Sequence, residues 1–91
     1  MDIHFLKSYD RSFRKLERPI QEKTILAVDS LLDFFYTRQK PEGLGLKKVY
    51  KNYWEIRIDI RYRIIFEFYG GGINIVFVGD HKEIKQFLRH G

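Results

Sequence analysis

Apolar and polar residues alternate strictly over positions 53–60 of the chain. Every second residue there is tryptophan or isoleucine, and the residues between them are Tyr53, Glu55, Arg57 and Asp59. A period of two places successive side chains on opposite faces of a β-strand, so the segment predicts a strand with one buried face. A similar alternation over residues 62–69 predicts a second strand, with the turn between Asp59 and Arg61.

The N-terminal part of the sequence predicts a strand followed by two helices. Residues 2–7 alternate as a short strand does, and Ser8 is placed to cap the helix that follows. Apolar residues recur in that helix at the spacing of one helical face: Tyr9, Phe13 and Leu16. Pro19 should end this helix and begin a second one, which runs to Thr37. The two helices therefore form a hairpin with a tight joint.

The second helix and the segment after it differ in character. The helix carries a broad apolar face that includes Ile25 and Leu26. Residues 37–52 then form a loop-like segment that is expected to be exposed and mobile, apart from a short strand over residues 46–50. This segment carries four lysines: Lys40, Lys47, Lys48 and Lys51.

The C-terminal third completes the predicted architecture. Three glycines at positions 70–72 predict a hairpin turn, and the almost wholly apolar residues 73–78 predict a central strand. Asp80 can cap a final short helix, with Glu83 at the spacing of a capping box. The order β-α-α-β-β-β-β-α predicts a single α+β domain over residues 1–91. Its helices are expected on one face of a mainly antiparallel sheet of four to five strands.

Composition narrows the function classes. The 91 residues include 17 Lys and Arg against 12 Asp and Glu, a net charge of +5, which favours an anionic partner such as RNA, DNA or an acidic protein segment. The absence of cysteine excludes disulfides and thiolate zinc sites. The three histidines, His4, His81 and His90, are too scattered to predict a metal site, and no cofactor is expected. Without a signal peptide or a membrane-length apolar run, a cytoplasmic protein is expected.

Arginines in the predicted β-hairpin are the clearest candidates for function. Arg57 and Arg63 should project from the face opposite Ile56, and antiparallel pairing can bring them within reach of each other. Two like charges so placed repel unless an anion lies between them, and a phosphate would suit the guanidinium fork. The structural alternative is a salt bridge from Arg63 to Glu55 or Glu67 across the sheet.

The hairpin "YWEIRIDIRYRIIFEF", the apolar strand after it and the ending "VGDHKEI" resemble the RelE/ParE superfamily of toxins of type II toxin–antitoxin systems. The resemblance covers nearly the whole chain, and "GDHKEI" is closer to the RelE-like branch. It implies a RelE-like fold and a ribosome-dependent mRNA endoribonuclease that needs no metal. It also implies inhibition by a cognate antitoxin, through which the pair would bind operator DNA.

The resemblance also implies roles for individual residues. Arg63 matches an arginine that contacts the scissile phosphate, and His81 matches a position proposed to protonate the leaving 5′-oxygen. Phe87 falls near a C-terminal aromatic residue, often tyrosine, that stacks on or orients a base, although phenylalanine lacks the hydroxyl. Arg57 matches a strand residue of mixed structural and phosphate-binding role.

The other basic residues are candidates for contact with the RNA or ribosome backbone. They are Lys47, Lys48, Lys51 and Arg61, and the simpler alternative is a solvated basic surface. The general base stays open between Glu55 and a lysine of lowered pKa. Two other functions also stay open: a ParE-like poison of DNA gyrase, and a degenerate toxin that only binds its antitoxin. His81 can alternatively be an idle surface residue in the first turn of a helix.

Overall fold

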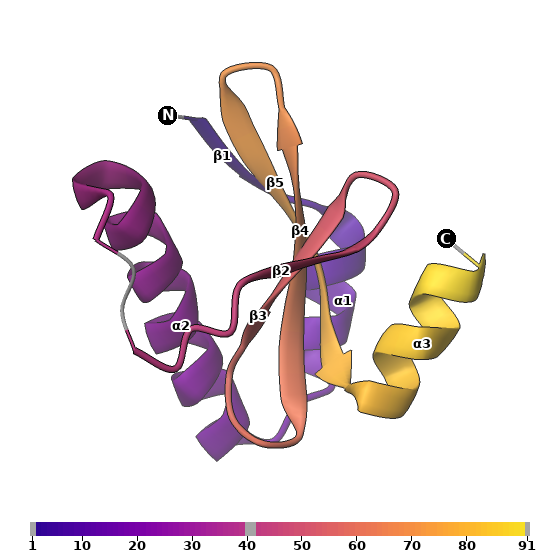
Figure 1. Ribbon diagram of the computed structural model, residues 1–91. Helices are drawn as coiled ribbons and strands as arrows, with labels where there is room; N and C mark the ends of the chain where they lie inside the picture. The colour runs from indigo at the N-terminus through magenta and orange to yellow at the C-terminus, as the bar shows by residue number, and fades with distance from the viewer. Residues whose placement is uncertain (1, 40–41, 91) are drawn as a thin grey trace.

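The computed structural model describes residues 2–39 and 42–90, and it contains the predicted elements in the predicted order (Figure 1). The elements are β1 (Asp2–Phe5), α1 (Lys7–Arg14), α2 (Arg18–Thr37), β2 (Lys47–Tyr50), β3 (Tyr53–Arg57), β4 (Tyr62–Tyr69), β5 (Gly72–Asp80) and α3 (His81–His90). Lys40 and Pro41 of the predicted loop lie outside the described residues. The α+β class is confirmed.

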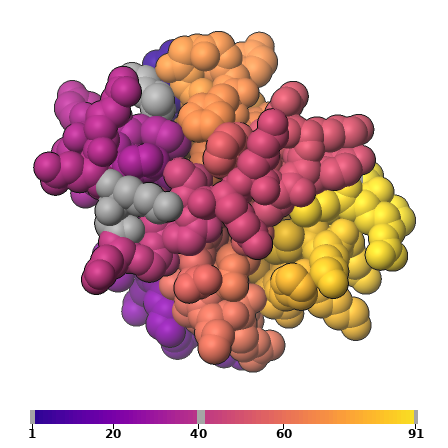
Figure 2. Space-filling view, in the orientation of Figure 1, coloured from indigo at the N-terminus to yellow at the C-terminus, as the bar shows by residue number. Residues whose placement is uncertain are grey.

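The five strands form one mixed sheet in the order β1-β5-β4-β3-β2. β1 pairs with β5 in parallel, and the other three pairs are antiparallel, so the prediction of a mainly antiparallel sheet is confirmed. β5 has a partner on both sides, as its apolar sequence predicts. In the space-filling view, the chain around β2 crosses the front of the molecule between α2 and α3 (Figure 2).

The helices cover both faces of the sheet, so the prediction that all of them lie on one face is wrong. Tyr9 of α1 and Leu31 of α2 belong to the larger core cluster, together with Ile56 and Ile64 of the sheet. α3 lies on the other side of the sheet (Figure 1), where Ile84 packs in a smaller cluster. The reason is that β5 is apolar on both faces and β4 adds Ile65 to the second face, so these strands must be covered on both sides.

The outer edge of β5 is completed by α1 rather than by a longer first strand. β1 pairs with β5 only as far as Ile75. Beyond that point the Ser8 hydroxyl donates a hydrogen bond to the Val76 carbonyl oxygen at 2.5 Å, and the Ser12 hydroxyl accepts one from the Val78 N–H at 3.1 Å. Ser8 is thus not the helix cap that the sequence predicts. Leu6, with extended backbone angles, precedes α1, and the serines satisfy buried sheet groups instead.

Three other local predictions differ from the structure. α1 ends at Arg14, well before Pro19, which lies in the first turn of α2. The apolar face of α2 is narrower than expected, because Ile25 and Leu26 are more than half exposed. The segment before β2 is anchored: Leu44 is buried, and its carbonyl oxygen accepts a hydrogen bond from the Arg57 N–H at 2.7 Å.

Candidate functional site

Charged side chains from three adjacent strands meet on the sheet face that α3 partly covers. Lys47 of β2 lies opposite Glu55 of β3, and Arg63 of β4 lies one diagonal step from Glu55. The Glu55 Oε2 atom is 3.6 Å from the Arg63 Nε atom and 3.8 Å from the Lys47 Nζ atom. The Glu55 side chain is 11% exposed, so its charge is compensated by two cations in a poorly solvated place. The Arg63–Glu55 salt bridge expected as the structural alternative is therefore present.

The guanidinium of Arg63 is also hydrogen-bonded to main-chain oxygens. Its Nη1 atom donates to the carbonyl oxygen of Asp59 at 2.6 Å and to that of Tyr62 at 3.0 Å. The Nε atom faces the Glu55 carboxylate. Nη2 forms no hydrogen bond with any residue in the ranges 2–39 and 42–90. The two N–H donors of Nη2 are therefore open to solvent or to a ligand.

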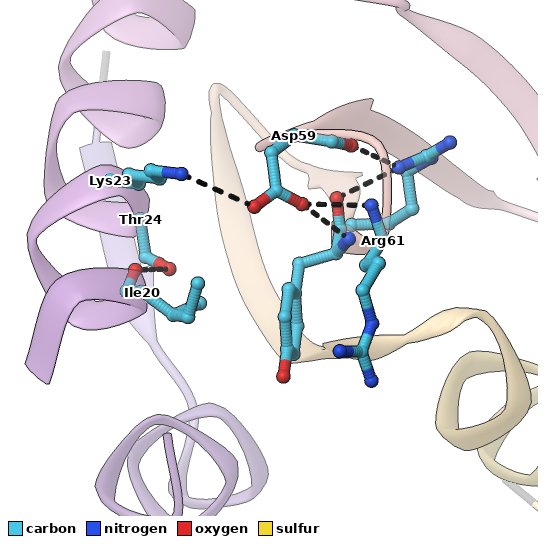
Figure 3. Close-up of polar contacts among 7 residues, drawn as sticks. Ile20, Lys23, Thr24, Asp59 and Arg61 are labelled. Carbon is cyan, nitrogen blue, oxygen red and sulfur yellow. Dashed lines mark hydrogen bonds and ion pairs between the residues drawn. The ribbon is translucent and has the colours of Figure 1, made fainter. Parts of the chain in front are cut away.

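The turn between β3 and β4 is built around Asp59 (Figure 3). Its Oδ1 atom accepts hydrogen bonds from the N–H groups of Arg61 at 2.8 Å and Tyr62 at 2.9 Å, and its Oδ2 atom is 3.6 Å from Lys23 of α2. Burial by itself raises the pKa of Asp59, but the N–H groups of Tyr62 and Arg61 and the Lys23 ammonium together lower that pKa below its usual value.

This turn explains two features of the hairpin sequence. An aspartate that bonds the backbone two and three residues later can close a turn without glycine. β3 therefore ends at Arg57, and Ile60 lies in the turn predicted between Asp59 and Arg61, with 89% of its surface exposed. The apolar alternation continues through Ile60 although the strand does not. Sequence reasoning assigned Asp59 no function, yet its carbonyl oxygen holds Arg63. An aspartate in a turn that has no glycine was the available signal.

Arg57 lies directly opposite Arg63 in the β3–β4 ladder, as predicted. The contacts of the two side chains nevertheless differ. Arg57 is exposed and lines a pocket of about 240 Å³ with Lys23 of α2 and Glu42, whereas Arg63 is tied to Glu55. The backbones of the two arginines are therefore paired, but their side chains contact different residues.

His81 begins α3, at the end of the sheet where Arg63 lies. Gly79 pairs with Arg63, and His81 follows two residues later as an exposed side chain. The capping box predicted for this helix is confirmed: the Glu83 N–H donates to Asp80 Oδ1 and the Asp80 N–H to Glu83 Oε1, both at 2.9 Å. A Cβ atom at Gly79 would lie 2.9 Å from the Glu83 Cβ atom, so glycine permits the close turn into α3.

Phe87 is a packing residue of α3 in this structure. Its ring stacks on Phe77 of β5 with centroids 4.5 Å apart and planes 11° apart. The ring of Tyr53 meets it at 6.1 Å and 60°. Contact with a base would use the part of this half-buried ring that is left open.

The lysines of β2 point to opposite faces of the sheet. Lys47 lies on the face of Glu55, and Lys48 pairs with Trp54 on the other face. Only Lys47 therefore joins the cluster of Lys47, Glu55 and Arg63, which we term the charged triad.

Lys51 and Arg61 lie in turns at opposite ends of β3. Lys51 has a positive φ of 49° and its ammonium lies 5.2 Å from the centre of the Tyr50 ring. The Arg61 guanidinium lies 5.6 Å from the centre of the Tyr62 ring. Both side chains are exposed, and neither forms an ion pair with the charged triad. Lys51 and Arg61 can each add to the basic surface, at two separate positions.

Comparison with known proteins identifies the fold. No family model and no curated protein matches the chain. Among solved structures, a chain of the RelB–RelE antitoxin–toxin complex from Methanococcus jannaschii superposes with a TM-score of 0.70 at 23% identity, covering 92% of this chain and 96% of that one. The chain has the fold of the RelE-type toxins.

Two further structures agree with this RelE-type fold. A chain of the E. coli DinJ–YafQ toxin–antitoxin complex matches with a TM-score of 0.67 at 13% identity, over 91% of this chain and 94% of that one. The YoeB/ParE toxin from Agrobacterium tumefaciens matches with a TM-score of 0.64 at 17% identity, over 89% and 99%. The RelE-like fold expected from the sequence resemblance is thus confirmed. Within the described ranges, none of the helices is both long and apolar enough to span a bilayer.

Proposed function

We propose that the protein is the toxin of a type II toxin–antitoxin system and cleaves mRNA in the ribosomal A site. The observation that carries this proposal is the Arg63 guanidinium, held on a RelE-type sheet with its Nη2 donors directed to no acceptor among the described residues. His81 lies at the same end of the sheet and is exposed. A cation for the phosphate and a titratable acid are two of the three aids that RNA cleavage requires.

The proposed reaction is a transesterification within the RNA. The 2′-oxygen of one nucleotide forms a bond to its own 3′-phosphorus, and the bond from that phosphorus to the 5′-oxygen of the next nucleotide breaks. A general base, Glu55 or a lysine, takes the 2′ proton, and His81 gives a proton to the departing 5′-oxygen. Arg63 stabilises the extra negative charge of the five-coordinate phosphorus. The products are a 2′,3′-cyclic phosphate and a 5′-hydroxyl.

The remaining basic residues and the partner complete the proposal. Lys47 and Arg57 would contact RNA phosphates without reading sequence. Lys48, Lys51 and Arg61 lie elsewhere on the surface and would add mainly to the basic field around the site. A cognate antitoxin would inhibit the protein in the cytoplasm, since two of the matched structures are antitoxin–toxin complexes. Operator DNA would be bound only through that antitoxin.

A degenerate toxin that only binds its antitoxin is the second candidate. Two observations favour it: Phe87 lacks a hydroxyl group and packs on Phe77, and Arg63 already has a carboxylate partner in Glu55. A gyrase poison is the third, and a matched structure is described as a YoeB/ParE toxin. Each of these predicts an uncut message.

Primer extension on an mRNA in a reconstituted translation reaction tests the proposal. We expect discrete cuts with the wild-type protein, none when ribosomes are omitted, and at least a roughly hundredfold loss with Arg63→Ala or His81→Ala. His90→Ala, at the other end of the same helix, is the matched control and should cut normally. Circular dichroism verifies that the variants fold.

The other outcomes of this experiment separate the rival functions. An intact message with folded wild-type protein would overturn the proposal. If the same protein inhibited the supercoiling activity of gyrase, the ParE-like function would replace it. If the protein affected neither reaction but bound an antitoxin, the function of a degenerate toxin would replace the proposal.

A further inference from the structure

We infer that Glu55 and Asp59 are positioning residues that fix the orientation of the Arg63 guanidinium and leave only Nη2 to a phosphate. This inference rests on the proposed function, because it concerns the arginine that would contact the scissile phosphate. It assigns Glu55 to positioning, so the role of general base falls to a lysine. Glu55 and Asp59 then act through Arg63 without touching the substrate.

Most N–H groups of the Arg63 guanidinium already face an acceptor within the protein. A guanidinium has five N–H donors: one on Nε and two on each terminal nitrogen. The Nε side faces the Glu55 carboxylate at 3.6 Å, and Nη1 donates to the carbonyl oxygens of Asp59 and Tyr62 at 2.6 and 3.0 Å. A phosphate bound in a bidentate manner through Nε and Nη2 would have to displace Glu55. Binding through Nη2 alone requires no such displacement.

The placement of Glu55 supports a positioning role. A carboxylate on a largely buried side chain in the middle of a strand is costly to bury, and an apolar residue would stabilise the sheet at least as well. Its two cationic partners come from the strands on either side, so the carboxylate joins β2, β3 and β4 through side chains. A rotatable arginine gains a fixed geometry from such a contact, and a fixed geometry lowers the cost of reaching the transition state.

Asp59 holds the opposite side of the guanidinium. Its carbonyl oxygen can accept from Nη1 because its carboxylate fixes the turn through the N–H groups of Arg61 and Tyr62. Lys23 of α2 lies 3.6 Å from the other carboxylate oxygen, so an ion pair links the turn to α2 (Figure 3). Arg63 is therefore oriented by a side chain from one direction and by a braced backbone carbonyl from the other.

Glu67 provides a matched control. It lies on β4 on the same face as Glu55, two residues beyond Ile65, but its carboxylate accepts a hydrogen bond from Asn74 and has no recorded contact with Arg63. Glu55→Gln and Glu67→Gln each remove one negative charge from the same sheet face. Long-range effects on RNA binding should therefore be similar in the two variants.

The first measurement is arginine side-chain NMR on the free protein. In the wild type and in Glu67→Gln we expect the Arg63 Nε–H to exchange slowly with water. In Glu55→Gln and in Asp59→Ala, which removes the carboxylate that braces the turn, we expect exchange to approach that of exposed arginines such as Arg11. Fast exchange in the wild type, or unchanged exchange in Glu55→Gln, would overturn the inference.

The second measurement is the kinetics of ribosome-dependent cleavage. We expect Glu55→Gln to lower kcat roughly tenfold without raising KM, because the arginine loses orientation while the site becomes more positive. Glu67→Gln should keep the wild-type kcat. A wild-type kcat in folded Glu55→Gln would overturn the inference. A message left uncut by the wild-type protein would overturn the proposed function instead, and the NMR comparison would still decide whether Arg63 is held.

Discussion

The two faces of the sheet differ in how many apolar and charged side chains they carry. The face covered by α1 and α2 is packed with ten buried residues, nine from five helices and strands and Leu44 from the segment before β2: Tyr9, Val28, Leu31, Leu44, Ile56, Ile64, Phe66, Ile73, Ile75 and Val78. The face covered by α3 has three buried apolar residues, Ile65, Val76 and Ile84, and beside them the charged triad of Lys47, Glu55 and Arg63. The first face is an ordinary dry core, and the second is partly open and holds charge.

The two faces contribute unequally to the stability of the fold. Apolar burial supplies most of the free energy of folding, so the larger cluster determines whether the sheet forms. Charges that are poorly solvated contribute little to stability and depend on exact partners. The charged triad can therefore be tuned for a ligand while the opposite face keeps the strands in register.

Matched isoleucine truncations should show the largest difference between the faces. Ile64→Ala should lower the free energy of unfolding by roughly 2–5 kcal/mol, because a fully buried side chain in the larger cluster leaves a cavity. Ile84→Ala should cost about 2 kcal/mol or less, because α3 can shift or open locally on the smaller cluster. Urea denaturation and amide hydrogen exchange measure both effects. Equal losses in the two variants would mean that the faces share one core.

Truncating the two neighbouring lysines of β2 should distinguish the faces in binding. Lys47→Ala should weaken ribosome or RNA binding and reduce the slope of log affinity against log salt by roughly 0.7–0.9, as one lost phosphate contact requires. Lys48→Ala, on the opposite face, should change both quantities much less. Filter binding across a salt series measures this. Equal effects, or a loss that does not depend on salt, would contradict a phosphate contact on the face of the charged triad.

The smallest effect concerns Tyr9, which belongs to the larger cluster. Burial, aided by the charge of Asp10, raises the pKa of Tyr9 from 10.0 to about 12. Because the folded state holds this proton more tightly, the stability it contributes is present below pH 10 and is lost as the pH rises to about 12. Tyr9→Phe should therefore lose less stability over that interval than the wild type in urea titrations. Tyr36→Phe, at a side chain that is 91% exposed, should behave as the wild type.

Local structure in this protein follows from signals between neighbouring residues. The periods of two and 3.6, the glycine turn and the capping box of Asp80 and Glu83 predict all eight elements in order, because these signals depend on neighbours in the chain. The antiparallel register that sets Arg57 opposite Arg63 also follows from a short hairpin. The register places Arg63, whereas the roles of Arg63 and His81 are implied by the resemblance to the RelE/ParE superfamily and stay predictions.

Contacts between residues far apart in the chain could not be predicted in this way. The tertiary structure placed α3 on the second face, gave the Ser8 and Ser12 hydroxyls to the edge of β5, and bound Arg63 to Glu55 and the carbonyl oxygen of Asp59. The sequence predicts the turn at Asp59 to Arg61, but not that the Asp59 carboxylate closes it by accepting hydrogen bonds from the N–H groups of Arg61 and Tyr62. The hydrophobic period of a strand or helix depends on nearby residues, whereas these contacts depend on the path of the whole chain.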